Sequence, residues 1–456
     1  MVHFIEWSNF VKKYINNEFK IWVCLIALIF NFCFSNSNLK AQENKVSSLR
    51  QKADQLAKAA EKNVINWRRD FHQHPELSNR EFLTAKKIAQ QLKDFGLEVK
   101  TGIAHTGVVG ILRGSKDNPV VALRADMDAL PVTEALDLEF ASKVKANFEG
   151  KEVGVMHACG HDAHMAMLLG VAEVLSKLRD QLPGTVKFIF QPAEEGAPDG
   201  ENGGAELMIQ EGALENPKPD AIFGLHVFPF HVGQIQYRPG PIMASVDGLQ
   251  IVVKGKQTHG AIPWGGIDPV VVASQIVLGL QSIISRQIDI TEAPAVISIG
   301  SIHGGVRGNI IPDQVELIGT IRTFDADVRE DVHARVRKTA ESIAQSAGAI
   351  AEVEIYRGYP VTKNDPALTE QMLPVLRNVA GADNVNTIAP KTVAEDFSYY
   401  QQQIPGLFFF LGIAPKDADL SKVAQNHSPY FYIDESGLIL GVRTMTHLAI
   451  EFLEKH

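Results

Sequence analysis

The chain has 456 residues, of which 45% are hydrophobic and 21% are charged, and its formal net charge is −9 at pH 7. This length predicts two or more domains, and the composition is typical of a globular protein with ample core, which excludes a disordered or fibrous chain. The acidic balance argues against a nucleic-acid-binding protein.

Residues 1–41 have the pattern of a signal peptide. Three lysines (Lys12, Lys13 and Lys20) precede an apolar run over residues 21–30, and a polar segment then leads to Ala41. A basic front, a short apolar core and a small residue at the end are typical of secretory signals. An uncleaved membrane anchor is the alternative, but the run is shorter than the roughly 20 apolar residues of a bilayer span. We therefore predict an exported protein, periplasmic or secreted, without a stable membrane anchor.

Cleavage near Ala41 would remove Cys24 and Cys33 and leave Cys159 as the one cysteine of the mature chain. A single thiol cannot form an intramolecular disulfide, so Cys159 is buried and inert, reactive in redox chemistry, or bound to a metal. A redox role would require an exposed thiol of low pKa.

Residues 45–240 are predicted to be the first part of an α/β catalytic domain. Residues 46–95 have a helical pattern interrupted by a turn over 66–76, and short apolar runs over 108–112, 120–123, 185–190 and 221–225 are typical of buried strands. Carboxylates or a histidine follow three of these strands: Asp126 and Asp128, Glu194 and Glu195, and His226. Any one of them could be a solvated polar residue, but ligands of α/β sheets gather beyond the carboxyl ends of strands.

The segment Met156–Met165 places one thiol, three imidazoles and one carboxylate in ten residues, directly before a helical apolar pattern. Cys159 and His161 are two residues apart, so in a loop their side chains can converge on a metal such as zinc, nickel or manganese. The alternative is a helix start with Asp162 as N-cap and histidines that are only polar loop residues.

Glu194 and Glu195 form the most mechanistic pair in the chain. Adjacent side chains of an extended segment point to opposite sides, so one carboxylate could bind a cation while the other acts as a base toward a water molecule. The alternative is a solvated acidic loop, because Asp199 and Glu201 are close in sequence.

Residues 241–356 are predicted to form an inserted domain, and residues 357–456 the second part of the catalytic domain. The insert reads as strand 249–254, helix 268–285, strand 295–302, strand 314–323, helix 328–347 and strand 351–356. This β-α-β-β-α-β order is typical of a ferredoxin-like fold. Asp325 or Asp327 is the expected N-cap of the second helix, and Gly348 its stop. Loops at His259 and Asn309 could close over a site or be ordinary turns.

Several motifs in order resemble the dinuclear-metal amidohydrolases related to aminoacylase and bacterial carboxypeptidase, in the branch of hippurate hydrolase and plant auxin-conjugate hydrolases. The resemblance covers nearly the whole mature chain. The matching segments are Arg69–Leu77, Ala122–Pro131, the Cys159 segment, Gln191–Gly196, Asn309–Asp313, Glu395–Phe397 and Asn426–Pro429.

The resemblance implies roles for these positions. Cys159 would bridge two divalent metal ions (manganese, zinc, nickel or cobalt), His161 and Glu195 would complete one metal site, and His226 and His427 the other. Glu194 matches the general base, and His259 a lid histidine that stabilises the oxyanion, often in the partner subunit of a homodimer formed through the lid. Asn309 and Arg322 resemble substrate-binding groups. Asp126 and Asp128 occupy positions where distant relatives have His-x-Asp, so we expect them to contact the metal ligands and not the metal ions.

The expected reaction is hydrolysis of an N-acyl amino acid to a carboxylic acid and a free amino acid, with water activated by the metal centre and deprotonated by Glu194. A dipeptidase or carboxypeptidase with the same centre is the nearest alternative. An exported, non-catalytic binding protein is a more distant one. The acyl group, the amino acid and the metal are not specified by the motifs.

Overall fold

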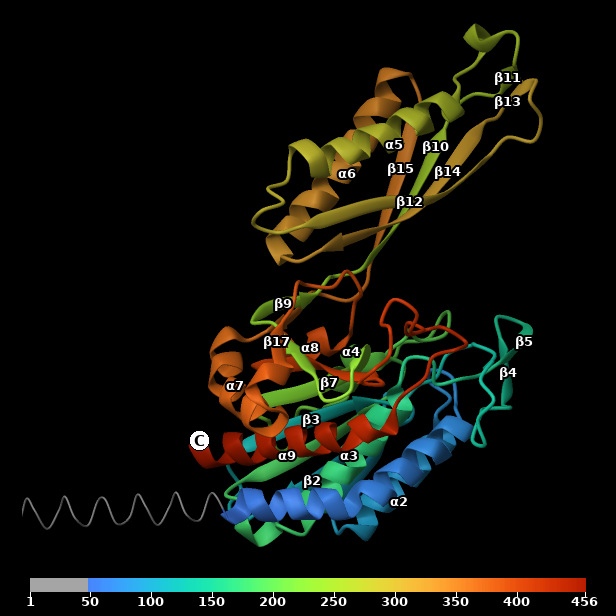
Figure 1. Ribbon diagram of the computed structural model, residues 1–456. Helices are drawn as coiled ribbons and strands as arrows, with labels where there is room; N and C mark the ends of the chain where they lie inside the picture. Colours follow the sequence, from blue (N-terminus) through green and yellow to red (C-terminus); the bar gives the residue numbers. More distant parts are fainter. Residues whose placement is uncertain (1–47) are drawn as a thin grey trace, which may run out of the picture. The chain divides into compact units, whose positions relative to one another are not determined.

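The structure is a computed structural model that describes residues 48–456 (Figure 1), and the predicted signal peptide lies outside these residues. Residues 48–73 form one continuous helix. The predicted turn over residues 66–76 is therefore wrong in its first part. Arg68 is helical and buried, and its Nε lies 2.9 Å from a carboxylate oxygen of Asp162. The helix ends just before Pro75, because a residue that precedes proline disfavours the helical conformation.

The predicted catalytic domain contains an eight-stranded sheet in the order β1-β2-β6-β3-β7-β18-β8-β17. Its strands are β1 (Glu98–Ile103), β2 (Gly107–Arg113), β3 (Val120–Asp126), β6 (Thr185–Gln191), β7 (Ala221–His231), β8 (Ile235–Tyr237), β17 (Val385–Thr387) and β18 (Gly406–Ala414). The four central strands, β6, β3, β7 and β18, are mutually parallel. Their near-continuous burial follows from helices on both faces, and the predicted mostly parallel α/β sheet is confirmed.

Helices cover this sheet on both faces. They are α2 (Phe82–Asp94), α3 (His161–Ser176), α4 (Gly204–Gln210), α7 (Pro366–Ala380), α8 (Phe397–Gln401) and α9 (Leu438–Lys455). Phe452 of α9 packs edge-on against Phe223, whereas Phe397 of α8 packs against Phe408. Phe408 pairs with Gly224, the residue after Phe223, so these two aromatic contacts lie on opposite faces of the sheet.

The inserted domain, called the lid below, contains a four-stranded antiparallel sheet in the order β12-β14-β10-β15. Its elements are β10 (Asp247–Lys254), α5 (Pro269–Arg286), β12 (Ala295–Gly304), β14 (Gln314–Thr323), α6 (Ala326–Ser346) and β15 (Ile350–Arg357). Both helices pack on one face of this sheet around a core that includes Ile251, Ile276, Leu317 and Val336 (Figure 1). The predicted ferredoxin-like order is confirmed.

The structure shows which residues begin and end the second helix of the lid. Asp325, not Asp327, is the N-cap of α6, because its carboxylate accepts hydrogen bonds from the backbone N–H groups of Asp327 and Val328. Gly348 follows the helix with a positive φ of 73°, as expected for a helix stop.

Short elements complete the described chain. They are the pairs β4 (Lys145–Phe148) with β5 (Lys151–Gly154), β9 (Gly240–Met243) with β16 (Thr362–Asn364) and β11 (Thr258–His259) with β13 (Ile310–Ile311), and the 3-10 turns Arg179–Gln181, Pro263–Gly265, Ala382–Asn384 and Glu435–Gly437.

Helix α5 is the one helix within residues 48–456 whose length and composition would allow it to cross a membrane. Its inner face is part of the lid core, through Val272, Ile276, Leu280 and Ile283. Its outer face leaves Val270, Val271 and Leu278 exposed. The inner face of α5 is thus apolar because it packs in the lid core. The apolar outer face is not covered by any described residue.

Candidate metal centre and active site

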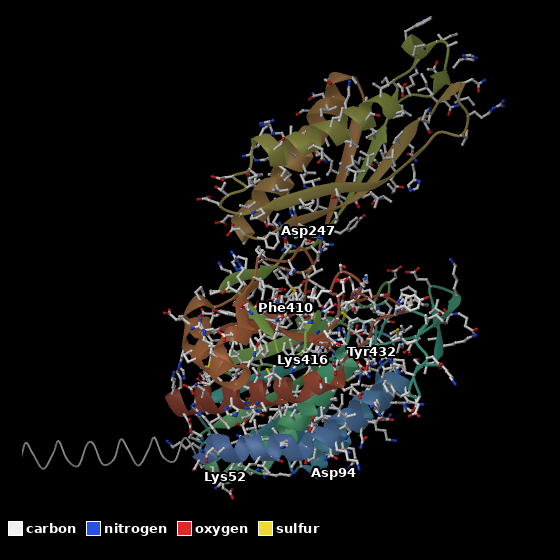
Figure 2. All side chains as sticks on the ribbon, viewed as in Figure 1. Lys52, Asp94, Asp247, Phe410, Lys416 and Tyr432 are labelled. Carbon is white, nitrogen blue, oxygen red and sulfur yellow. The ribbon has the colours of Figure 1, made fainter. Side chains whose placement is uncertain are left out.

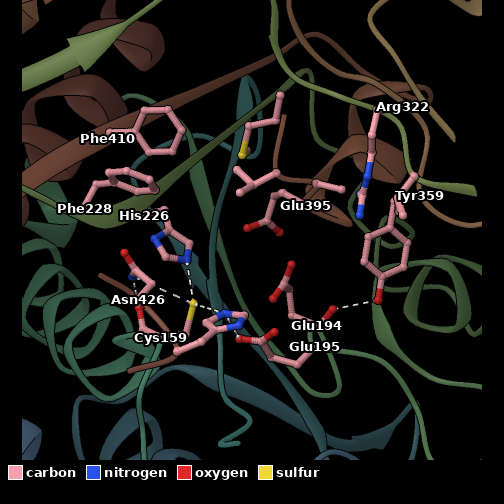
Figure 3. A pocket seen from close by; sticks show the side chains of 15 residues that line it. Cys159, Glu194, Glu195, His226, Phe228, Arg322, Tyr359, Glu395, Phe410 and Asn426 are labelled. Atoms are coloured by element: carbon pink, nitrogen blue, oxygen red, sulfur yellow. Dashed lines mark hydrogen bonds and ion pairs between the residues drawn. The ribbon is translucent and has the colours of Figure 1, made fainter. Parts of the chain in front are cut away.

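A cavity of about 300 Å³ lies beyond the carboxyl ends of the central strands, where the sequence places the carboxylates and histidines. Figure 3 shows this cavity from close by. Its lining residues are Cys159, Glu194, Glu195, His226, Phe228, Met243, Val246, Arg322, Tyr359, Val393, Ala394, Glu395, Phe410, Asn426 and His427. The lining therefore combines ionisable groups with apolar side chains.

The loop that carries Cys159 turns sharply into α3. Gly160 has a φ of 100°, and a Cβ atom there would lie 2.3 Å from a methyl group of Val227, so only glycine fits. Asp162 is not the N-cap, because it lies inside the first turn of α3. Its carboxylate instead accepts a hydrogen bond from His72 Nδ1 at 2.8 Å and contacts Arg68. Through these contacts the N-terminal helix, residues 48–73, fixes the position of the Cys159 loop.

Five predicted ligands converge at this loop. The Cys159 sulfur lies 3.3 Å from Nε2 of His226 and 3.3 Å from Nε2 of His427. A Glu195 carboxylate oxygen lies 3.1 Å from Nε2 of His427 and 3.9 Å from Nε2 of His161. The structure thus brings together one thiol, three imidazoles and one carboxylate from four separate segments of the chain.

Hydrogen bonds on the far side of two imidazoles set their tautomers. His161 donates through Nδ1 to the carbonyl oxygen of Asp128 at 2.8 Å, and His226 donates through Nδ1 to that of Val227 at 2.7 Å. In the neutral form of each ring, which metal coordination requires, the lone pair is then on Nε2, which faces the cluster. Nε2 of His161 is buried without a hydrogen-bond partner. Such an orphaned nitrogen fits a ligand of a divalent metal ion.

The charge of the cluster also fits a metal ion. Burial and the carboxylates of Glu195 and Glu194 raise the pKa of the Cys159 thiol well above its ordinary value. Burial lowers the pKa of His161, but Asp126 and Asp128 outweigh it and raise this pKa to about 10. The protein groups alone therefore have an excess of negative charge, which coordinated cations would balance while they hold Cys159 as a thiolate.

Glu194 lies beside these groups with a different environment. It is buried, and burial together with the carboxylates of Glu395 and Glu195 raises its pKa well above the ordinary value. Its carboxylate oxygen lies 3.8 Å from Nε2 of His161. Figure 3 shows that the carboxylates of Glu194 and Glu395, which both line the cavity, point toward each other. A carboxylate of raised pKa at a cavity is suited to accepting and returning a proton.

Asp126 and Asp128 lie behind the cluster. Asp126 contacts Arg124 Nη1 at 2.7 Å and accepts a hydrogen bond from His164 Nδ1 at 2.6 Å. Asp128 accepts the backbone N–H groups of Glu194 and Glu195 at 3.1 and 3.0 Å. Asp128 thereby holds the backbone from which both neighbouring carboxylates extend. Both carboxylates lie near Nε2 of His161, at 3.8 and 3.9 Å, and only that of Glu195 also contacts His427.

The three remaining predicted residues are placed differently. Arg322 of β14 is half-buried and lines the cavity. His259 and Asn309 are exposed on the β11/β13 ribbon of the lid, where the N–H of Gly260 donates to the carbonyl of Asn309 at 2.8 Å. Neither belongs to the described residues that line the cavity. The structure thus places these two residues on one ribbon and not at the Cys159 cluster.

Residues 122–451 match peptidase family M20/M25/M40. This chain belongs to that family. It is an enzyme, a metal-dependent hydrolase, as the motifs of the Cys159 and Glu194 loops predicted.

The M20 chain is similar to several characterised relatives over most of its length. It is 44% identical to Thermostable carboxypeptidase 2 of Saccharolobus solfataricus, over 86% of this chain and 96% of that protein. It is 41% identical to N-acetylcysteine deacetylase of Bacillus subtilis, over 87% of this chain and 98% of the relative. The crystal structure of Bacillus subtilis YXEP protein, described as a dinuclear metal binding peptidase, matches with a TM-score of 0.72 and 39% identity, over 88% and 100% of the two chains.

Three side chains at this M20 site had no role predicted from the sequence. Glu395 and Arg124 were visible only within matching motifs, and their ion pair at 2.9 Å depends on the fold. Tyr359 donates a hydrogen bond through its hydroxyl to the backbone carbonyl of Glu194 at 2.7 Å. No pattern marks a single tyrosine in a linker, so only the tertiary structure finds it.

Proposed function

We propose that this M20 hydrolase cleaves the amide bond of N-acyl amino acids and releases a carboxylic acid and a free amino acid. The observation that carries the proposal is a cavity lined both by the Cys159 cluster and Glu194 and by the apolar side chains of Phe228, Phe410 and Met243. An apolar acyl group would lie against these apolar side chains with its carbonyl toward the cluster. The resemblance to hippurate and auxin-conjugate hydrolases and the similarity to a deacetylase support this substrate class.

Cys159, His161, Glu195, His226 and His427 would hold two divalent ions, with Cys159 between them. When bound, manganese, zinc, nickel or cobalt ions would supply Lewis acidity toward water and the amide carbonyl. The fixed Nε2 lone pairs of His161 and His226 support these assignments.

Glu194 is proposed as the general base and acid. Its carboxylate takes a proton from the attacking water and gives it to the nitrogen of the leaving amino acid. Burial among other carboxylates supports this role, since it raises the pKa of Glu194 and so favours the protonated form that returns the proton.

Arg322 is proposed to bind the carboxylate of the substrate. A guanidinium group is the preferred partner for a carboxylate, and Arg322 is a cavity-lining cation opposite the Cys159 cluster. His259 and Asn309 are proposed to stabilise the oxyanion in the cavity of a partner subunit.

A homodimer formed through the lid would supply these two residues. The exposed apolar side chains of α5, Val270, Val271 and Leu278, are suited to such an interface. We also propose that the N-terminal segment directs export, supported by its basic and apolar pattern.

A carboxypeptidase or dipeptidase is the second candidate. It is favoured by the 44% identity to a protein named Thermostable carboxypeptidase 2. The same cluster would act on a peptide bond, and the difference lies in which group fills the apolar wall.

The test is hydrolysis by the mature protein after chelation and after adding back manganese, zinc, cobalt or nickel. Hippurate, N-acetyl amino acids and matched dipeptides form the substrate panel. We expect metal-restored release of free amino acid from the acyl substrates. Cleavage of the dipeptides with no cleavage of any acyl substrate, in protein that holds two metal ions, would instead establish the peptidase.

A further inference from the structure

The loop that carries Glu194 is held in an unusual backbone conformation. Ala193, just before Glu194, has a φ of 52°, which a residue with a side chain rarely adopts. Its backbone N–H donates to a Glu81 carboxylate oxygen at 3.0 Å, and Asp128 accepts the next two N–H groups. Such a conformation persists only where the surroundings hold it. Side chains of the catalytic domain thus hold every N–H group from Ala193 to Glu195.

The carbonyl group of Glu194 is held by a different part of the chain. The hydroxyl of Tyr359 donates to it at 2.7 Å (Figure 3). Tyr359 lies in the linker between β15 of the lid and β16. Burial and nearby carboxylates raise the pKa of Tyr359 well above its ordinary value, so the hydroxyl stays protonated and remains a donor.

Two linkers join the lid to the rest of the chain, one before β10 and one after β15. The second linker, which contains Tyr359, is hydrogen-bonded to the first linker and to the lid. The N–H of Val246 donates to the carbonyl of Tyr359 at 3.0 Å, and the N–H of Gly358 donates to that of Val246 at 3.0 Å. Asp247, at the start of β10 (Figure 2), accepts from Arg329 Nε at 2.9 Å and His333 Nε2 at 2.7 Å. Asp247 also accepts the N–H of Gly358 at 3.3 Å. The linkers and helix α6 therefore form one hydrogen-bonded unit.

We propose that Tyr359 is a positioning residue for Glu194, through which the linkers of the lid set the geometry of the catalytic base. The inference rests on the proposed role of Glu194. The hydroxyl does not touch the reacting atoms. It holds the peptide group from which the Glu194 side chain extends, so a change in linker conformation changes where the carboxylate lies. Proton transfer is sensitive to such displacement, since a shift of about 1 Å can cost up to about 100-fold in rate.

The test is the Tyr359→Phe variant of the full-length, metal-loaded enzyme, assayed with the fastest substrate of the panel above. This change removes one hydroxyl and keeps the ring, which packs edge-on against Tyr399 with centroids 6.1 Å apart. We expect kcat to fall by about tenfold while KM changes less than twofold and the metal content stays the same. The solvent isotope effect on kcat should rise, because proton transfer becomes slower relative to the other steps.

Tyr399→Phe is the matched control. Tyr399 is also partly buried, but its hydroxyl interacts with Glu206 of α4 and not with the Glu194 loop. We expect wild-type kcat in this control. Equal losses of kcat in the two variants would overturn the proposal, because the effect would then belong to the packing of the two rings.

A double-mutant cycle separates positioning from general structural damage. If Tyr359 acts only through Glu194, Tyr359→Phe should cause no further loss of the residual rate in a Glu194→Gln enzyme. Multiplicative losses would overturn the inference. An active Glu194→Gln enzyme would overturn the proposed function itself, whereas an inactive one combined with wild-type kcat in Tyr359→Phe would overturn only the role of Tyr359.

Discussion

The Cys159 cluster and the β11/β13 ribbon of the lid contain histidines in opposite situations. At the cluster, His161 is buried, donates to a backbone carbonyl and is surrounded by carboxylates. On the ribbon, His259 is exposed, and its Nδ1 accepts only the nearby N–H of Ala261 at 3.0 Å. Hydrogen bonds and buried charge hold the cluster side chains in an arrangement suited to coordination. The proposed role of the ribbon residues requires the cavity of a partner subunit.

Because of this difference, substitutions in the two regions should have different measurable effects. Changes at the cluster should affect metal content, proton transfer or folding, because its groups share hydrogen bonds and buried charge. Changes on the ribbon should affect turnover alone, because the ribbon contributes little to the core.

The largest effect is expected from Glu194→Gln. Loss of the general base should reduce kcat by about 10³-fold or more while both metal ions stay bound. Glu195→Gln, the neighbouring change, should instead reduce metal content, as measured by elemental analysis of the purified protein. Normal turnover by Glu194→Gln, or full metal content in Glu195→Gln, would contradict the division of roles between these two carboxylates.

Next in size is the change Arg124→Met. Arg124 is buried and contacts Asp126, Glu395 and Asp396 at 2.7, 2.9 and 2.9 Å. Its removal leaves these carboxylates without their cation and should lower the free energy of unfolding by about 3–5 kcal/mol. Denaturant unfolding measures this loss. Arg113→Met, which removes an exposed pair with Glu98, should change it by less than about 1 kcal/mol, and similar losses in the two variants would argue against the buried ion cluster.

His259→Ala should reduce kcat by about 100-fold, the loss seen when one oxyanion donor is removed. Metal content and melting temperature should not change, because His259 is exposed. Mixing this variant with Glu194→Gln protein, after reversible dissociation, should restore activity if each cavity uses His259 of the partner subunit. Mixed dimers that form but stay inactive would show that His259 does not act across the interface.

The smallest effect is expected from Asp325→Ala in the lid. Its carboxylate caps α6 through the N–H groups of Asp327 at 2.9 Å and Val328 at 3.2 Å. Loss of this cap should cost about 1 kcal/mol of stability, with kcat unchanged. Asp327→Ala, in the first turn of the same helix, should cost only a few tenths of a kcal/mol. The reverse order, measured by thermal unfolding, would contradict the assignment of the cap.

Patterns of short range in the chain were sufficient for much of the fold. The lid follows its predicted order because alternation in β10 and β14 and helical spacing in α5 and α6 are local properties. The predicted turn over residues 66–76 was wrong for the opposite reason. Arg68 is polar and suggests a surface, but the distant carboxylate of Asp162 allows it to be buried within a helix.

By itself, the sequence determined the family and the residue types of the site, because strand ends and the Cys159 segment contain those residues in order. The tertiary structure decided the contacts that no motif implied. It placed Glu395 beside Glu194, separated His259 and Asn309 from the cavity and brought the Tyr359 hydroxyl to the Glu194 carbonyl. Such contacts join residues far apart in the chain, where local patterns contain no information about distance, and their effect on pKa depends on burial that only the folded protein creates.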